Sequence, residues 1–258
     1  MPSVASLGEL RRAAAEFTVA DVALVIEAAA LAAARRSLEA SGLLLLGEVH
    51  GVRENPLIIR ALMRALGLNG LALEWPAELA PAVGAFLAGG TLADHPLLWA
   101  GDGRITAGHL AVLRERAAAG PLSLTLFDGA AGAGWSWSQR DEAMAKRILA
   151  ASAAGDGILV VAGNAHTTTT RTGRGMPLGA CLARQRPGIA EIRVRYGGGR
   201  YYNVEPRRFV GVRRGSRQAR LHHSRDALVL DLPAAGEAVV PQRPGPWPDS
   251  ARPGVESS

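Results

Sequence analysis

The chain has 258 residues, of which 48% are hydrophobic, and its formal net charge at pH 7 is +6. This length and composition are sufficient for one sizeable core in a single domain. The one cysteine, Cys181, has no second cysteine to pair with, which excludes an internal disulfide and a cysteine-based metal cluster. A cytoplasmic location is expected.

The N-terminus has no pattern that would direct the chain to a membrane. Residues 1–17, MPSVASLGELRRAAAEF, place charged side chains where a signal peptide needs an apolar stretch. No segment reaches the roughly 18 uninterrupted apolar residues that a membrane-spanning helix needs. We therefore predict neither export nor a membrane partner.

Arginine supplies almost all of the positive charge, since Lys146 is the one lysine. The segment RRFVGVRRGSRQARLHH (residues 207–223) concentrates that charge. Such a patch is compatible with nucleic-acid binding, but no recognised nucleic-acid motif accompanies it. A solvated, arginine-rich loop is the preferred interpretation, and a nucleic-acid partner is not expected.

Helical periodicity marks residues 7–17 and 19–40 as an N-terminal helical lead-in, after which strands and helices alternate. Strands are predicted at residues 43–46, 71–73, within LSLTLFDG (122–129) and within GILVVAGNAH (157–166). Helices are predicted at residues 55–66, 77–87, 109–118 and 141–152. Strands separated by helices of this length are typical of β-α-β units. We therefore predict an α/β fold with a mainly parallel sheet and helices on both faces.

The C-terminal part is predicted to complete one domain, residues 1–240. Residues 189–194 and 227–232 are expected to add strands at an edge of the sheet. Residues 241–258, rich in proline, glycine and serine, are expected to form a disordered tail.

All four of the predicted parallel strands end in titratable side chains. The first runs into Glu48 and His50, the second into Glu74, the third into Asp128 and the fourth into His166. Because the carboxyl ends of parallel strands share one edge of a sheet, these side chains are expected to converge there, where ligands bind. The first and fourth strands also end in the same motif, Gly-x-x-His, as GEVH and GNAH.

Two imidazoles with two or three carboxylates favour hydrolysis by one of two routes. The groups could hold a divalent metal ion that lowers the pKa of a bound water, or a histidine oriented by a carboxylate could deprotonate water directly. A mixed nitrogen and oxygen ligand set suits Zn, Mn, Co or Fe better than Mg or Ca. The sequence leaves both routes open.

The same motifs carry a family resemblance, strongest over residues 43–182. In order they are GEVHG, RENP, LALEWP, QRDEAMA, GNAH and GMPLGACL. Together they resemble the superfamily that joins the erythromycin esterases, the ChaN-type haem-binding proteins and the Tiki/TraB proteases. Their order and spacing resemble the ChaN branch most.

The resemblance implies that His50, His166, Glu48 and Glu74 form the site. In the Tiki-like proteases the equivalent motifs are taken to bind a divalent metal, which would make these four residues metal ligands. In the erythromycin esterases a histidine at the place of His50 is taken as the general base. Arg140 and Asp141 resemble the family's Arg-Asp pair and are expected to form a buried ion pair beneath the pocket.

Three further residues are predicted to bind substrate. Arg53 and Arg171 follow the two Gly-x-x-His motifs and are expected to line the mouth of the site, where they would favour an anionic group. Asp128 is included because it ends the third strand. His95, His109, His222 and His223 are interpreted as structural or surface residues.

Other catalytic signatures are missing: there is no Gly-x-Ser-x-Gly elbow and no phosphate-binding Walker loop, and TGRGMPLG (residues 172–179) lacks dinucleotide-binding spacing. The sequence therefore predicts a hydrolase that acts on an ester or amide bond of a small molecule or peptide. The alternative is a non-catalytic haem-binding protein of the ChaN type, in which the histidines, Tyr196, Tyr201, Tyr202 or Met176 would supply axial ligands.

Overall fold

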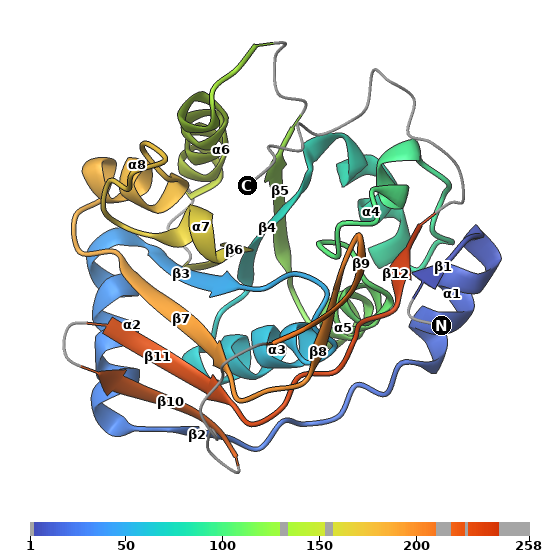
Figure 1. Cartoon of the computed structure of the whole chain (residues 1–258), viewed down its shortest axis with the longest axis horizontal. Helices are drawn as coiled ribbons and strands as arrows, with labels where there is room; N and C mark the ends of the chain where they lie inside the picture. The colour runs from blue at the N-terminus through green and yellow to red at the C-terminus, as the bar shows by residue number, and fades with distance from the viewer. Residues whose placement is uncertain (1–2, 130–133, 153–156, 210–217, 225–226, 243–258) are drawn as a thin grey trace.

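The computed structural model describes residues 3–129, 134–152, 157–209, 218–224 and 227–242 (Figure 1). Its centre is an eight-stranded sheet in which every neighbouring pair is parallel except β10 and β11. In spatial order the strands are β2 (Leu24–Ile26), β10 (Ala219–Ser224), β11 (Ala227–Leu232), β7 (Ala190–Tyr196), β3 (Leu43–Glu48), β6 (Ile158–Gly163), β4 (Gly70–Pro76) and β5 (Ser123–Asp128). The predicted fold class is confirmed.

The helices connect these strands and cover the sheet. They are α1 (Leu7–Glu16), α2 (Ala28–Ser41), α3 (Asn55–Leu66), α4 (Ala80–Leu87), α5 (Ala107–Ala119), α6 (Trp137–Ala151), α7 (Asn164–Thr167) and α8 (Leu178–Gln185), with short 3-10 turns at Ala77–Leu79 and Pro96–Trp99. Two small two-stranded sheets complete the described part: β1 (Ser3–Val4) with β12 (Val240–Pro241), and β8 (Arg200–Asn203) with β9 (Glu205–Arg208).

Both faces of the central strands are buried, which explains the unbroken leucine run of β3. Leu44 and Leu46 pack into a core that includes residues of α1 to α5, whereas Leu43 and Leu45 pack into a second core with α6 and α8. Because successive side chains of a strand point to opposite faces, a strand covered on both sides must be apolar at every position. The helices thus lie on both faces, as predicted.

Three details of the sequence prediction are wrong. The region predicted as helix at residues 19–40 contains the edge strand β2 before α2 begins at Ala28. The strands predicted for an edge, β7 and β11, lie inside the sheet, because β10 and β2 extend it beyond them. The arginine-rich segment, interpreted as a solvated loop, contains most of strand β10. Its buried alternation is limited to Ala219 and Leu221, which is too short to predict a strand.

Two residues of the expected disordered tail, Pro241 and Gln242, belong to the fold. Pro241 belongs to β12, and the Gln242 amide donates to the Val4 carbonyl at 2.8 Å. Residues 243–258 of that prediction, and residues 210–217 of the arginine-rich segment, lie outside the described residues. Among the described helices, none has the length and apolar character needed to cross a membrane.

Candidate active site

The two Gly-x-x-His motifs lie side by side because their strands are neighbours. β3 and β6 pair in parallel, with Gly47 opposite Ala162 and Glu48 opposite Gly163. Glycine at position 47 allows α7 to pack closely on β3, since a Cβ there would lie 2.5 Å from the Thr167 hydroxyl and would force that side chain to shift. The first motif continues into a turn, whereas the second forms the short helix α7.

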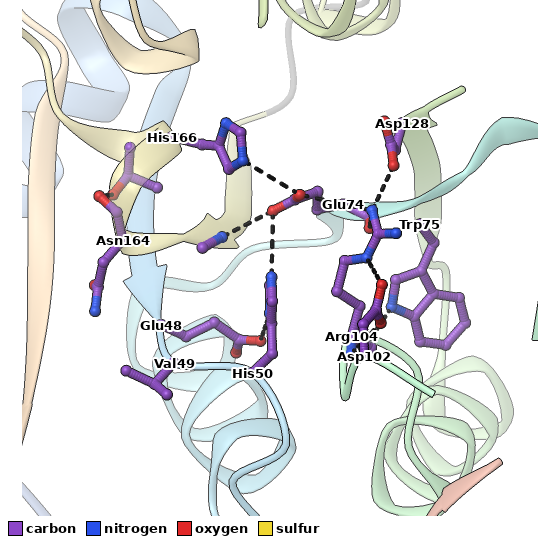
Figure 2. A network of polar contacts seen from close by, with 12 residues as sticks. Glu48, Val49, His50, Glu74, Trp75, Asp102, Arg104, Asp128, Asn164 and His166 are labelled. Carbon is purple, nitrogen blue, oxygen red and sulfur yellow. Dashed lines mark hydrogen bonds and ion pairs between the residues drawn. The ribbon is translucent and has the colours of Figure 1, made fainter. Parts of the chain in front are cut away.

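Glu74 lies between the two histidines (Figure 2). It comes from β4, the strand beside β6, and its Oε2 accepts a hydrogen bond from the Gly163 amide at 2.8 Å. His50 Nε2 lies 3.6 Å from Glu74 Oε2, and His166 Nε2 lies 3.6 Å from Glu74 Oε1. The sequence prediction that His50, Glu74 and His166 meet at the carboxyl edge of the sheet therefore agrees with the geometry.

Each histidine is oriented by its own carboxylate through the other ring nitrogen. His50 Nδ1 lies 3.2 Å from Glu48 Oε1, and His166 Nδ1 lies 2.8 Å from Asp141 Oδ1. Asp141 is completely buried in α6, and its Oδ2 also accepts the Leu178 amide at the start of α8, at 2.7 Å. These contacts fix the direction in which both Nε2 atoms point.

The Trp137 ring covers His166. The two rings stack with their centroids 5.3 Å apart and their planes at 24°. Trp137 is the first residue of α6, whose N-terminus is fixed by a capping box between Ser136 and Gln139. An indole face over an imidazole favours the charged form of that imidazole.

Two arginines surround the other side of Glu74. Arg140 Nη2 lies 3.4 Å from Glu74 Oε1 and 2.9 Å from Asp128 Oδ2. Arg104 Nη1 lies 3.6 Å from Glu74 Oε1 and also contacts Asp128, while its Nε donates to Asp102 at 2.7 Å. The site thus holds alternating positive and negative groups, which allows these charges to be buried together.

These surroundings shift the pKa values of the central groups. Burial by itself raises the pKa of Glu74, but the charges of His166, His50, Arg104 and Arg140 outweigh it and hold that pKa far below its usual range. Burial lowers the pKa of His50, yet the hydrogen bond to Glu48 and the charge of Glu74 outweigh burial and raise it. For His166, the Glu74 charge and the Asp141 hydrogen bond likewise outweigh burial and raise the pKa.

The four predicted metal ligands do not converge on one point. Glu48 lies at Nδ1 of His50, whereas Glu74 lies at Nε2 of the same ring. Glu74 already faces two guanidinium groups, which disfavour a dication beside it. Within the described residues, no group of three or more His, Cys, Asp or Glu side chains is arranged to hold a metal ion. The metal site stays a prediction from the sequence.

The predicted substrate-binding residues lie in different settings. Asp128 is buried, and its carboxylate forms ion pairs with both Arg104 and Arg140. The Arg53 guanidinium lies 5.9 Å from the centre of the Phe17 ring, and Arg171 is exposed in the segment after α7.

The predicted ion pair between Arg140 and Asp141 is wrong, and two further residues of the site, Arg104 and Asp102, were not predicted. Arg140 and Asp141 do not pair with each other: Arg140 faces Glu74 and Asp128, and Asp141 faces His166. They diverge because neighbours on a helix point about 100° apart. Arg104 and Asp102 were not predicted, since they come from an irregular loop without a periodic signal.

Two of the three tyrosines considered as haem ligands, Tyr196 and Tyr202, use their hydroxyl groups in hydrogen bonds within the fold. The Tyr196 hydroxyl donates to Asn55 Oδ1 at 3.0 Å and accepts the Val49 amide at 3.0 Å. Burial raises the pKa of Tyr196, which keeps it a neutral phenol. The Tyr202 hydroxyl bonds to Gln242. Haem binding remains an untested prediction.

No known family model matches the chain, and no curated protein matches it. Among solved structures, the chain is similar to a protein from Bacillus cereus known from a crystal structure. The two superpose with a TM-score of 0.58 over 92% of this chain and 100% of that chain, at 9% sequence identity. This likeness shows the fold alone.

Proposed function

We propose that the chain is a hydrolase of an ester or amide bond in a small molecule or peptide. The proposal rests on one arrangement: two histidines, each oriented by its own carboxylate, that direct their Nε2 atoms at a shared third carboxylate, Glu74. A carboxylate-oriented imidazole is the usual construction of a general base or acid in hydrolysis. The resemblance to the erythromycin esterase and Tiki superfamily points to the same chemistry.

In the proposed reaction His50 is the general base. Unprotonated at Nε2, it takes a proton from a water, and the water oxygen attacks the carbonyl carbon of the substrate. The negative charge of Glu48 at Nδ1 stabilises the imidazolium that forms. His166, protonated at Nε2, then gives that proton to the departing oxygen or nitrogen, and Asp141 keeps its ring in position.

The arginines would support the charge that develops on the carbonyl oxygen. The Arg140 side chain is 28% exposed and that of Arg104 is 12% exposed. Arg140 is therefore the better candidate for contact with substrate. Preorganised donors of this kind stabilise an oxyanion because they need no reorientation during the reaction.

The proposal is tested with simple acyl substrates. The purified protein is assayed with p-nitrophenyl acetate, p-nitrophenyl butyrate and a fluorogenic peptide, alongside His50→Ala and His166→Ala. Each variant should lose hydrolysis by about 100-fold or more, as expected for a missing acid or base. His223→Ala is the matched control, because His223 is exposed on β10. Equal rates in all four proteins would overturn the proposal.

A further inference from the structure

Among the residues that the structure describes, one oxygen of Glu48 has no hydrogen-bond partner. Oε1 faces His50, but within the described residues nothing donates to Oε2, which is buried, and the residue as a whole is only 4% exposed. An unsatisfied oxygen on a buried carboxylate destabilises the folded protein, so such atoms normally bind water.

A small cavity adjoins this carboxylate. Glu48, His50, Glu74, Arg104 and His109 supply its polar lining, and Trp75 and Leu73 are among its apolar walls. The space open to the centre of a water molecule is about 10 Å³. Roughly 10–15 Å³ of such space, with two or more polar partners, is what one buried water requires.

His109 contributes a second polar side chain to the lining of this cavity. It is 4% exposed, and its Nδ1 lies 2.9 Å from the Thr106 hydroxyl, which also accepts the His109 backbone amide at 3.1 Å. Thr106 is buried, and among the described residues its hydroxyl hydrogen has no acceptor other than Nδ1. Donation to Nδ1 leaves the imidazole proton on Nε2.

The charge state of His109 is consistent with this assignment. Burial lowers the pKa of His109 and outweighs the raising effect of the Glu48 charge, so its ring is neutral near pH 7. A neutral ring that accepts at Nδ1 has one donor, at Nε2. His109 is not part of the catalytic arrangement described above, and from the sequence it was interpreted as a structural or surface residue.

We propose that this cavity binds one water molecule, which accepts a hydrogen bond from His109 Nε2 and donates one to Glu48 Oε2. His109 is then a positioning residue: through the water it fixes the Glu48 carboxylate, and Glu48 fixes His50. The water site stands on the cavity, on the unpaired Glu48 Oε2 and on the tautomer of His109, which also lines the cavity. The positioning role rests on the proposed function, in which His50 is the base.

The water site is tested by a high-resolution crystal structure of the full chain and of two variants. The parent should show density at roughly 2.6–3.2 Å from both Glu48 Oε2 and His109 Nε2. His109→Gln keeps a donor near the position of Nε2 and should keep that density, whereas His109→Leu should lose it. A direct contact between His109 Nε2 and Glu48, or a parent without density there, would overturn the water site.

The positioning role is tested with p-nitrophenyl acetate. His109→Leu should lower kcat about tenfold with little change in KM, which corresponds to one hydrogen bond to a charged group. His109→Gln should restore kcat to near the parent value. If His109→Leu and His109→Gln lost kcat equally, His109 would contribute to packing alone. If the parent itself has no esterase activity, the proposed function fails, and the crystallographic result still decides the water site.

A third variant guards against a folding defect. His109→Asn places its amide near the position of Nδ1, so it keeps the polar contact with Thr106 but is too short to reach the water. Asn should therefore behave like Leu in kcat and in density while its circular dichroism matches the parent. Parent-like kcat in His109→Asn would contradict the positioning role.

Discussion

His50 and His166 approach Glu74 from two neighbouring strands, and each Nε2 lies 3.6 Å from a different oxygen of that carboxylate. Three residues that are 24 and 92 positions apart in the sequence, at 50, 74 and 166, thus form one contact group. The parallel order β3, β6, β4 is what brings them together.

Stability should fall as pH rises above neutrality. The folded pKa of both His50 and His166 is raised, so the folded protein binds more protons than the unfolded chain between about pH 6.5 and those folded values. Stabilisation by the imidazolium ions is therefore fully present below pH 6.5 and is lost through that window. Urea unfolding at several pH values measures it. In the double variant His50→Gln, His166→Gln the free energy of unfolding should depend less on pH. An equally steep dependence would show that the two histidines do not cause it.

Asp141→Asn should lower the pKa of His166. The substitution removes the charge that stabilises the imidazolium while keeping the size of the side chain. It should also cost about 1–3 kcal/mol of stability, because an amide cannot accept at both its atoms from His166 and Leu178. NMR titration of the histidines and urea unfolding measure the two effects. The control is Glu142→Gln on the same helix, whose exposed carboxylate pairs with Lys146 and should change neither value.

Gly51→Ala should destabilise the protein strongly. Gly51 has φ +72°, and a Cβ there would lie 1.6 Å from the Tyr202 carbonyl oxygen of β8. Gly42 has a similar φ of +74° with nothing near its Cβ position, so Gly42→Ala measures the backbone strain alone, about 1–2 kcal/mol. Gly51→Ala should exceed it by at least about 2 kcal/mol in urea unfolding. Equal costs would mean that the β8–β9 hairpin moves away freely.

A chelator should leave ester hydrolysis unchanged. The proposed reaction uses only His50, His166 and their carboxylates, and these side chains do not converge as ligands of one ion. The measurement is the rate before and after EDTA treatment, with elemental analysis of the purified protein. Loss of activity that Zn or Mn restores would instead support the metal-assisted route. A Soret band that saturates at a fixed haem ratio would support the haem-binding alternative.

Arg171→Ala should weaken binding of an anionic substrate more than Arg53→Ala does. Arg171 is exposed after α7, close in sequence to His166, whereas the Arg53 guanidinium lies over Phe17. A p-nitrophenyl ester of succinate carries the anionic group, and p-nitrophenyl acetate is its neutral control. The KM for the succinate ester should rise by roughly fivefold in Arg171→Ala, as for an exposed ion pair worth up to about 1 kcal/mol. Unchanged KM values would make Arg171 a solvated loop residue.

The amino-acid sequence was enough to predict the α/β class, because leucine runs between amphipathic helices are a local signal of strands buried on both faces. It also identified His50, Glu74 and His166 as candidates, since each lies at or just after the end of such a strand. The contacts among these groups are known only from the three-dimensional arrangement of the strands and helices. Glu48 orients His50 instead of joining Glu74, and Arg140 turns away from Asp141. Arg104 enters the site from an irregular loop. Periodicity records the face on which a residue lies, whereas contacts between distant segments depend on strand order and helix orientation, which no local pattern encodes.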